Sequence, residues 1–317
     1  MLKPIKYLIP TTIFVLLIIN GTWAHDKNKK VLAKTIFGQF TTPAKTKTES
    51  IGKYNKGCLN GGVELPIKGE TWQIINSKRG RNWGHPDLIS FTKSLSVKAK
   101  KIGWKGLYIG DLGNPRGGPT PYGHVSHQSG LEVDIKMKRP NSLDLSPAES
   151  NNDPRYGKRL FKELDVVTKD QKNINSNWTK EHMAIIKAAA KNDKVNKIFV
   201  NAAIKVWMCK NEGPIDRKWL MKVRPEKGHR EHFHVRLKCP ERSVNCINTP
   251  LWNKYKNIDG CDKQLNWWVT DRLKPKPKPK KKPKKTVKIK KKYRCSGAWC
   301  YLPEDLPKNC MRTMHLN

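Results

Sequence analysis

Two groups of histidines in this sequence have the residue types and the spacing of a metal site. Residues 228–236 read GHREHFHVR and hold three of the nine histidines, His229, His232 and His234. Upstream, the stretch GHVSHQSGLEVDIKM carries His124, His127 and Asp134. Two imidazoles and one carboxylate form a ligand set for a first-row metal, and an open fourth position is typical of catalytic zinc.

The segments that carry these residues alternate polar and apolar side chains, which predicts strands. The polar faces of residues 131–137 and 232–237 hold Glu132, Asp134, Lys136, His232, His234 and Arg236. Neighbouring antiparallel strands would bring Asp134 beside the histidine pair, and His127 would reach them from the loop before the first strand. Gly130 permits a tight turn in that loop.

A strand with the pattern His-x-His places both rings on one face, so that one ring can bind a metal while its neighbour transfers a proton. At this spacing His232 and His234 each fit either role. Zinc lowers the pKa of a bound water to about 7 and polarises a carbonyl, which is the chemistry of amide hydrolysis. The alternative, purely structural histidines, suits a single ring better than several rings converging with an aspartate. We therefore expect a zinc hydrolase.

The surrounding sequence predicts a mixture of helices and short strands, with no internal repeat. Apolar spacing predicts helices over residues 85–104 and 179–194, and residues 104–112 and 197–200 are predicted strands. The expected fold class is α+β, a small antiparallel sheet that carries the zinc site, is flanked by helices and is stapled by disulfides. His85 either caps the first helix or contacts substrate, and His182 is expected at the surface of the second. Trp267 and Trp268 are expected in the core, with a sugar-stacking platform as the alternative.

The first 24 residues predict a signal peptide that is cut after Ala24, because two lysines precede an apolar run and a small-residue exit. The apolar run is short for a bilayer span, and an uncleaved anchor is the alternative. Either form exports the folded part. Export favours disulfides among the eight cysteines, which are too scattered for a zinc ribbon.

The net charge of +38 includes a dense run near the end of the chain, and the body before that run is basic as well. About thirteen of the positive charges lie between Arg272 and Lys292, in RLKPKPKPKKKPKKTVKIKKK. Alternating lysine and proline predict a solvated, polyproline-like linker. For an exported protein, such charge favours an anionic cell-wall or envelope surface over nucleic acid, and simple solubility is the alternative.

Several stretches resemble the penicillin-insensitive murein endopeptidases, zinc peptidases grouped with lysostaphin, D-Ala-D-Ala peptidases and hedgehog-like domains. The resemblance runs from about Ile51 to Trp268 and is carried by RNWGHPDLI, IGDLGNPRGGP, GHVSHQSGLEVDI, KIFVN, KVRP and GHREHFHVRLKCP. It implies a periplasmic zinc enzyme that cuts the D-alanyl-diaminopimelate crosslink between peptidoglycan stems.

The resemblance also implies roles for individual residues. The implied zinc ligands are His127, Asp134 and His234. The implied catalytic neighbours are His232 and His229, and His124 lines the site as a candidate ligand in some states. Asp170 matches a further metal-binding aspartate of the family, but its partner position holds Asn173, which argues against a second metal. The implied disulfides are Cys58–Cys310, Cys209–Cys261 and Cys239–Cys246, which leaves Cys295–Cys300.

We therefore expect five regions: a signal peptide (1–24), a polar lead-in (25–50), a zinc peptidase domain (51–270), a basic linker (271–292) and a cysteine-containing tail (293–317). The expected function is hydrolysis of peptidoglycan crosslinks, with peptidoglycan and an anionic envelope surface as partners. Two alternatives are open, a D,D-carboxypeptidase on the same core and a non-catalytic wall-binding protein. The histidine and aspartate set disfavours the second, because a binding protein does not need it.

Overall fold

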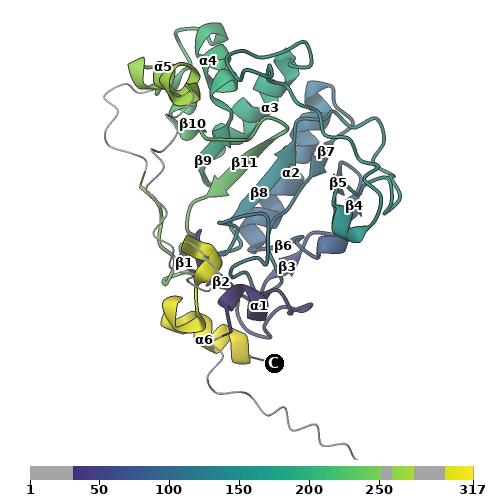
Figure 1. The fold of residues 1–317 in the computed structure, drawn as a ribbon, viewed down its shortest axis with the longest axis vertical. Helices are drawn as coiled ribbons and strands as arrows, with labels where there is room; N and C mark the ends of the chain where they lie inside the picture. Colours follow the sequence, from purple (N-terminus) through teal and green to yellow (C-terminus); the bar gives the residue numbers. More distant parts are fainter. Residues whose placement is uncertain (1–30, 251–258, 275–296, 317) are drawn as a thin grey trace, which may run out of the picture. The chain divides into compact units, whose positions relative to one another are not determined.

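The computed structural model describes residues 31–250, 259–274 and 297–316, so the predicted signal peptide lies outside the described residues. A seven-stranded sheet forms the centre of the fold (Figure 1). Its strands lie in the order β10 (Val223–Pro225), β9 (Val195–Val200), β11 (His232–Leu237), β8 (Glu132–Lys136), β7 (Leu107–Ile109), β5 (Trp72–Ile74) and β4 (Lys68–Gly69). The two histidine-motif segments therefore form neighbouring strands in the middle of the sheet.

The pairing of the strands makes the sheet mixed. β11 runs antiparallel to both β8 and β9, whereas β10 is parallel to β9 and β5 is parallel to β7. The α+β prediction is confirmed, although the sheet is wider than expected and is not wholly antiparallel. The central pair that the alternation predicted is antiparallel, and it is this pair that positions the site.

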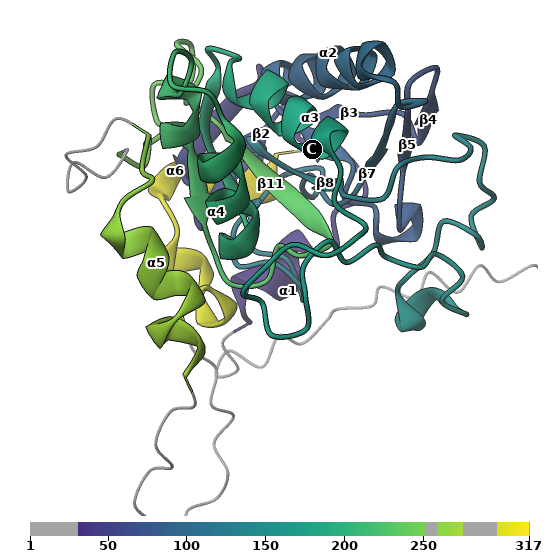
Figure 2. The same ribbon diagram turned by 90° about the horizontal axis from the view of Figure 1, so that it is seen from above.

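Helices α2 (Pro86–Ile102), α3 (Lys180–Ala190) and α4 (Ala202–Asn211) pack beside the sheet (Figure 2). α2 begins at His85, whose Nδ1 accepts a hydrogen bond from Asp87 N at 3.1 Å, and ends at Gly103 with a left-handed φ of 107°. His85 is therefore a helix cap, one of the two roles expected for it. The apolar faces of the helices and of the sheet meet in the main core, which includes Leu88, Leu95, Val133, Ile135, Ile185 and Val235.

A second apolar cluster joins the two ends of the described chain. The hairpin of β1 (Glu49–Lys53) and β2 (Lys56–Asn60) packs there with α1 (Ala33–Phe37) and α6 (Lys308–His315). Residues 31–50, which we expected to form a polar lead-in, thus contribute Ala33 and Phe37 to a core. The expected tail is likewise part of the folded unit. The other short elements of the described chain are a small sheet of β3 (Val63–Glu64) and β6 (Trp83–Gly84) and the helices η1 (Ser77–Arg79), η2 (Pro154–Tyr156), η3 (Lys218–Lys222), η5 (Gly297–Cys300) and η6 (Pro303–Asp305).

Three disulfides join pairs of described residues: Cys58–Cys310, Cys209–Cys261 and Cys239–Cys246. They are the pairs that the family resemblance implied. Cys58–Cys310 spans 252 residues and ties α6 to the β1–β2 hairpin. Cys300 is also disulfide-bonded, and Cys295, its expected partner, lies outside the described residues.

Two expectations about aromatic and imidazole side chains are wrong. His182 is buried rather than at the surface, with 4% of its area exposed. Trp267, on α5 (Lys263–Val269), is 43% exposed, and Trp268 is only partly buried, so this pair is not part of the main core.

Arg272, which we placed in the linker, lies in the short helix η4 (Asp271–Leu273). Within the described ranges, no helix combines the length and the apolar character needed to cross a membrane.

Candidate metal centre

The centre of the site is a pair of side chains that face each other across β8 and β11. The register places His234 directly opposite Asp134, so both side chains leave the same face of the sheet. Nδ1 of His234 lies 3.0 Å from Oδ1 of Asp134. The alternate residues Val133 and Val235 point into the main core, and this packing fixes the strands that carry the polar face.

His127 reaches the same carboxylate from the loop before β8. Its ring is 1% exposed, and its Nε2 lies 3.5 Å from Oδ1 of Asp134. Nδ1 of His127 donates to the carbonyl oxygen of Leu112 at 2.5 Å, which leaves the lone pair of a neutral ring on Nε2. The backbone of His127 adopts a left-handed φ of 68°, which is uncommon for a residue with a side chain. A hydrogen bond from His127 N to Oε2 of Glu132, 2.6 Å long, holds this conformation.

Two of these buried polar atoms have no hydrogen-bond partner among the described residues, Nε2 of His127 and Oδ1 of Asp134. Burying a polar atom without a partner costs about 1–3 kcal/mol, so such atoms usually have a purpose. The two atoms lie 3.5 Å from each other, and Nδ1 of His234 lies 3.0 Å from the Asp134 oxygen. The donor set of two imidazole nitrogens and one carboxylate oxygen fits a zinc ion.

His124 lies at the edge of this group. Its Nε2 is 3.4 Å from Oδ2 of Asp134 and 3.2 Å from Oδ2 of Asp111. Ligand atoms of His124, His127 and Asp134 lie within 4.8 Å of one another, so among the described residues this compact group contains His124 and not His234. His124 differs from His127 and His234 because its side chain is 25% exposed and because Asp111 already provides it with a second carboxylate.

The remaining two histidines of the motif lie on the outer side of the cluster. Nε2 of His232 is 3.9 Å from Oδ1 of Asp134, which places His232 beside the ligand set. The ring centroids of His229 and His232 are 4.9 Å apart. His229 also has a left-handed φ, 53°, and its Nδ1 donates to the carbonyl oxygen of Lys227 at 3.0 Å.

The charges of the cluster are strongly coupled. Burial alone would raise the pKa of Asp134, but His124, His127 and His232 hold it well below its usual value. Burial alone would lower the pKa of His234, but Glu132 and Asp134 raise it to about 9. His229 has a pKa lowered to about 4, first by burial and then by the positive charge of His232 and His234. A cation is therefore favoured beside Asp134, whereas His229 stays neutral at pH 7.

Comparison with known proteins assigns the family. The penicillin-insensitive murein endopeptidase family matches residues 50–315. The penicillin-insensitive murein endopeptidase of Escherichia coli (strain K12) is 39% identical over 282 residues, which cover 88% of this chain and 90% of the relative. The protein of the same name from Shigella flexneri serotype 5b (strain 8401) has the same identity and coverage, and that from Shigella sonnei (strain Ss046) is 39% identical over 247 residues, 77% of this chain and 84% of the relative. The chain belongs to this peptidase family.

The family match extends beyond the region that carried the resemblance in the sequence. It runs to residue 315 and so includes α6, which the Cys58–Cys310 disulfide joins to the β1–β2 hairpin. Residues 297–316 are accordingly a part of the peptidase fold rather than an addition to it.

Glu132 is one of two residues of the site whose role the sequence did not reveal. It is completely buried, and its Oε1 accepts hydrogen bonds from Nε2 of His234 at 2.7 Å and from Nε of Arg236 at 2.8 Å. Its other oxygen accepts from the backbone of His127. One carboxylate therefore orients two candidate ligands. Its position on the polar face of β8, two residues before Asp134, was the available signal.

Asp111 is a second missed residue, and Asp170 lies apart. Asp111 is buried and accepts hydrogen bonds from Arg79 and Arg81 while it contacts His124.

Oδ1 of Asp170 accepts hydrogen bonds from Thr168 Oγ1 at 2.6 Å and from Lys172 N at 3.1 Å, and its side chain is exposed. Asp170 therefore closes its own turn and is not in the group of ligand atoms around Asp134.

Proposed function

We propose that this protein is a zinc-dependent murein endopeptidase that hydrolyses the D-alanyl-diaminopimelate crosslink of peptidoglycan in the periplasm. The observation that supports the proposal most strongly is a pair of buried atoms without a hydrogen-bond partner among the described residues, Nε2 of His127 and Oδ1 of Asp134, the second of which lies 3.0 Å from Nδ1 of His234. The names of the relatives supply the substrate class, since each is called a murein endopeptidase.

His127, Asp134 and His234 would hold the zinc ion. His234 is a better third ligand than His124 because Glu132 binds its Nε2 and thereby directs Nδ1 at Asp134. His124 contacts two carboxylates from a more exposed position, so we assign it to the edge of the site, where it can bind metal in some states. A bound zinc ion activates water and polarises the amide carbonyl.

His232 and His229 would handle protons and substrate beside the metal. Nε2 of His232 lies 3.9 Å from the proposed ligand atom of Asp134, close enough to reach a group bound at the metal. Its side chain is partly exposed, so a substrate can approach it. We assign to it the transfer of a proton to the leaving amine, which makes it a general acid. His229 is neutral at pH 7 because its pKa is about 4, so its free Nε2 accepts a hydrogen bond.

The proposed cellular location rests on sequence features outside the described residues. The signal peptide of residues 1–24 would export the chain, and the lysines of residues 275–292 would attract it to an anionic wall. Neither Asp170 nor Asn173 is needed for one zinc ion. We therefore propose a single metal, with Asp170 outside its ligand set.

The function is tested by digesting purified sacculi and identifying the soluble products by mass. We expect crosslinked dimers to be converted into monomers, with the reaction stopped by a chelator and restored by zinc. Release of terminal D-alanine without loss of dimers would show a D,D-carboxypeptidase instead. Binding to sacculi with no bond cleaved, in protein that contains its metal, would favour the wall-binding alternative and refute the proposal.

A further inference from the structure

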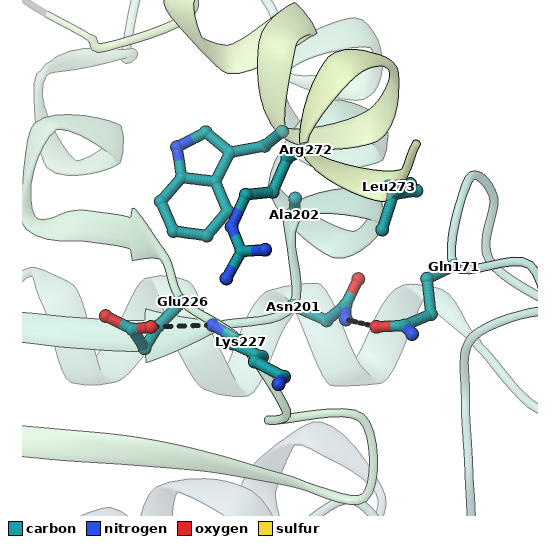
Figure 3. A pocket seen from close by; sticks show the side chains of 8 residues that line it. Gln171, Asn201, Ala202, Glu226, Lys227, Arg272 and Leu273 are labelled. Carbon is teal, nitrogen blue, oxygen red and sulfur yellow. Dashed lines mark hydrogen bonds between the residues drawn. The ribbon is translucent and has the colours of Figure 1, made fainter. Parts of the chain in front are cut away.

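A pocket beside the histidine cluster has no role in the proposed reaction. It lies between η4 and the beginning of α4 and is open to solvent (Figure 3). Its lining includes Asn201, Lys227, Trp268 and Arg272. We ask what this pocket is suited to bind.

The pocket shares a wall with the metal site through Asn201. The backbone N–H of Asn201 donates to the carbonyl oxygen of His229 at 3.0 Å, and its Nδ2 donates to the carbonyl oxygen of Gly228 at 3.2 Å. Oδ1 of Asn201 accepts from Ala203 N and so caps α4. The turn that carries His229 towards the metal site is therefore one side of the pocket. The same turn reaches the histidine cluster, since the ring centroid of His229 lies 4.9 Å from that of His232.

The lining carries more positive than negative charge. Figure 3 shows the guanidinium of Arg272 reaching into the pocket from η4, with Lys227 and Glu226 on the opposite side. Among the described residues, neither Arg272 nor Lys227 lies within 4.0 Å of a carboxylate oxygen. Glu226 accepts a hydrogen bond from the backbone of Lys227 rather than pairing with either cation. Two cations thus remain available to a ligand.

Arg272 lies beside an aromatic ring. Its guanidinium carbon lies 5.9 Å from the centroid of the Trp268 ring, within the range of a cation–π contact. Arg272 is partly buried, whereas Lys227 is exposed. A pre-positioned guanidinium next to an indole suits a carboxylate on an aliphatic chain, because the fork binds both oxygens while the ring covers the chain.

We propose that this pocket is a specificity subsite that binds a free carboxylate of the stem peptide, with Arg272 as its main contact and Lys227 as the second. The inference rests on the proposed function for the identity of the ligand. Diaminopimelate is a dicarboxylic acid, so the crosslinked residue retains a free carboxylate close to the scissile amide. The pocket is one turn away from the histidines that would act on that amide.

Steady-state kinetics on two soluble crosslinked muropeptides test the subsite, one with free carboxylates and one with these carboxylates amidated. On the free acid, Arg272→Gln should raise KM about tenfold, the effect of one lost charge-assisted hydrogen bond, and change kcat less than about twofold. Lys227→Gln should raise KM less. On the amidated substrate, Arg272→Gln should change nothing. The matched control is Lys263→Gln on α5, which removes an exposed charge that does not line the pocket.

Two results would overturn the subsite. One is an unchanged KM for Arg272→Gln on the free acid, and the other is an equal loss on the acid and the amide. If the wild-type enzyme cleaves neither muropeptide, the proposed function fails, and the pocket is then judged by calorimetric titration with the free-acid muropeptide. About tenfold weaker binding by Arg272→Gln supports the carboxylate site, and equal binding by both proteins refutes it.

Discussion

The metal centre and the beginning of α3 both bury histidine, but they do so in opposite ways. At α3, Nδ1 of His182 accepts a hydrogen bond from Thr179 N at 3.1 Å, and Nε2 donates to the carbonyl oxygen of Met137 at 2.8 Å. The ring also stacks on Trp178 and meets the edge of Trp104. In the cluster, Nε2 of the equally buried His127 has no hydrogen-bond partner within the described part of the chain.

The difference shows that burial and residue type do not identify a functional histidine. Both rings are almost fully buried, and both have one nitrogen bonded to a main-chain carbonyl. Only the second nitrogen separates them. A ring whose two nitrogens are both satisfied holds structure together, whereas a ring whose lone pair faces a carboxylate and another imidazole is prepared for a cation. The predictions for His232, His234, Glu132 and His182 test the difference between these two environments, and a last prediction concerns the lysine-rich segment.

The largest contrast is expected between the two histidines of the His-x-His pair. His234→Ala should lose both the metal and the activity, because it removes a proposed ligand. His232→Ala should retain the metal and lose about 10²- to 10⁴-fold in rate, the usual contribution of general acid–base catalysis. Metal content and turnover on a crosslinked muropeptide, measured on the same preparations, separate the two. A metal-free His232→Ala and a metal-loaded His234→Ala would mean that the roles are exchanged.

A smaller effect is expected at Glu132, which supports the ligands without touching the metal. Glu132→Gln keeps the shape of the side chain but loses the charge that orients His234, so zinc affinity should fall about 10- to 100-fold. Competition with a zinc-binding dye measures this directly. The control is Glu163→Gln, because Glu163 pairs with Lys136 on the same face of β8. Equal affinities for the wild type and Glu132→Gln would remove Glu132 from the site.

His182 should show the reverse behaviour. His182→Ala leaves a gap between two tryptophans and a carbonyl without its donor, so the free energy of unfolding should fall by about 3 kcal/mol while metal content and kcat stay unchanged. Urea unfolding provides the measurement, and His315→Ala, at an exposed position, is the control. A loss of metal in His182→Ala would contradict the separation of the two histidine environments.

The same residue predicts a pH dependence of stability. Burial lowers the pKa of His182, so below about pH 6.5 the unfolded chain binds a proton that the folded chain does not. The folded state therefore loses stability as the pH falls through this region. When the free energy of unfolding is measured at several pH values, it should change less steeply with pH for His182→Ala than for the wild type. Identical slopes would show that His182 does not contribute.

The smallest effect is expected from the lysine-rich segment. If its charges attract the enzyme to an anionic wall, replacing the lysines of residues 276–292 with glutamine should weaken co-sedimentation with sacculi at low salt. The difference should disappear at high salt because salt screens the attraction. The Debye length is about 10 Å at 0.1 M and becomes shorter as the salt concentration rises. Turnover on a soluble muropeptide should not change. Overlapping binding curves at every salt concentration would leave the segment as a solvated linker only.

The alternation of side chains was sufficient to predict the central strands and the convergence of His127, Asp134 and His234. A period of two fixes which residues share a face, and apolar partners such as Val133 and Val235 fix which face is buried. Sequence therefore predicted the part of the site that depends on local periodicity. The assignment of roles within the His-x-His pair required the family resemblance.

The features that the sequence did not predict depend on contacts between segments far apart in the chain, which local patterns do not encode. The role of Glu132 requires the register that places His234 opposite Asp134. The burial of His182 requires Trp104 from another part of the chain, so its polar neighbours in sequence were misleading. The packing of α1 and α6 around one disulfide likewise joins residues that lie far apart in the sequence.

The central claim is that the unpartnered atoms of His127 and Asp134 exist to hold one zinc ion together with His234. Elemental analysis of the purified full-length chain, before and after dialysis against a chelator, tests it most directly. We expect one zinc per chain, its removal by the chelator with loss of crosslink cleavage, and recovery of both when zinc is returned. Full cleavage by protein that contains no metal would contradict the account.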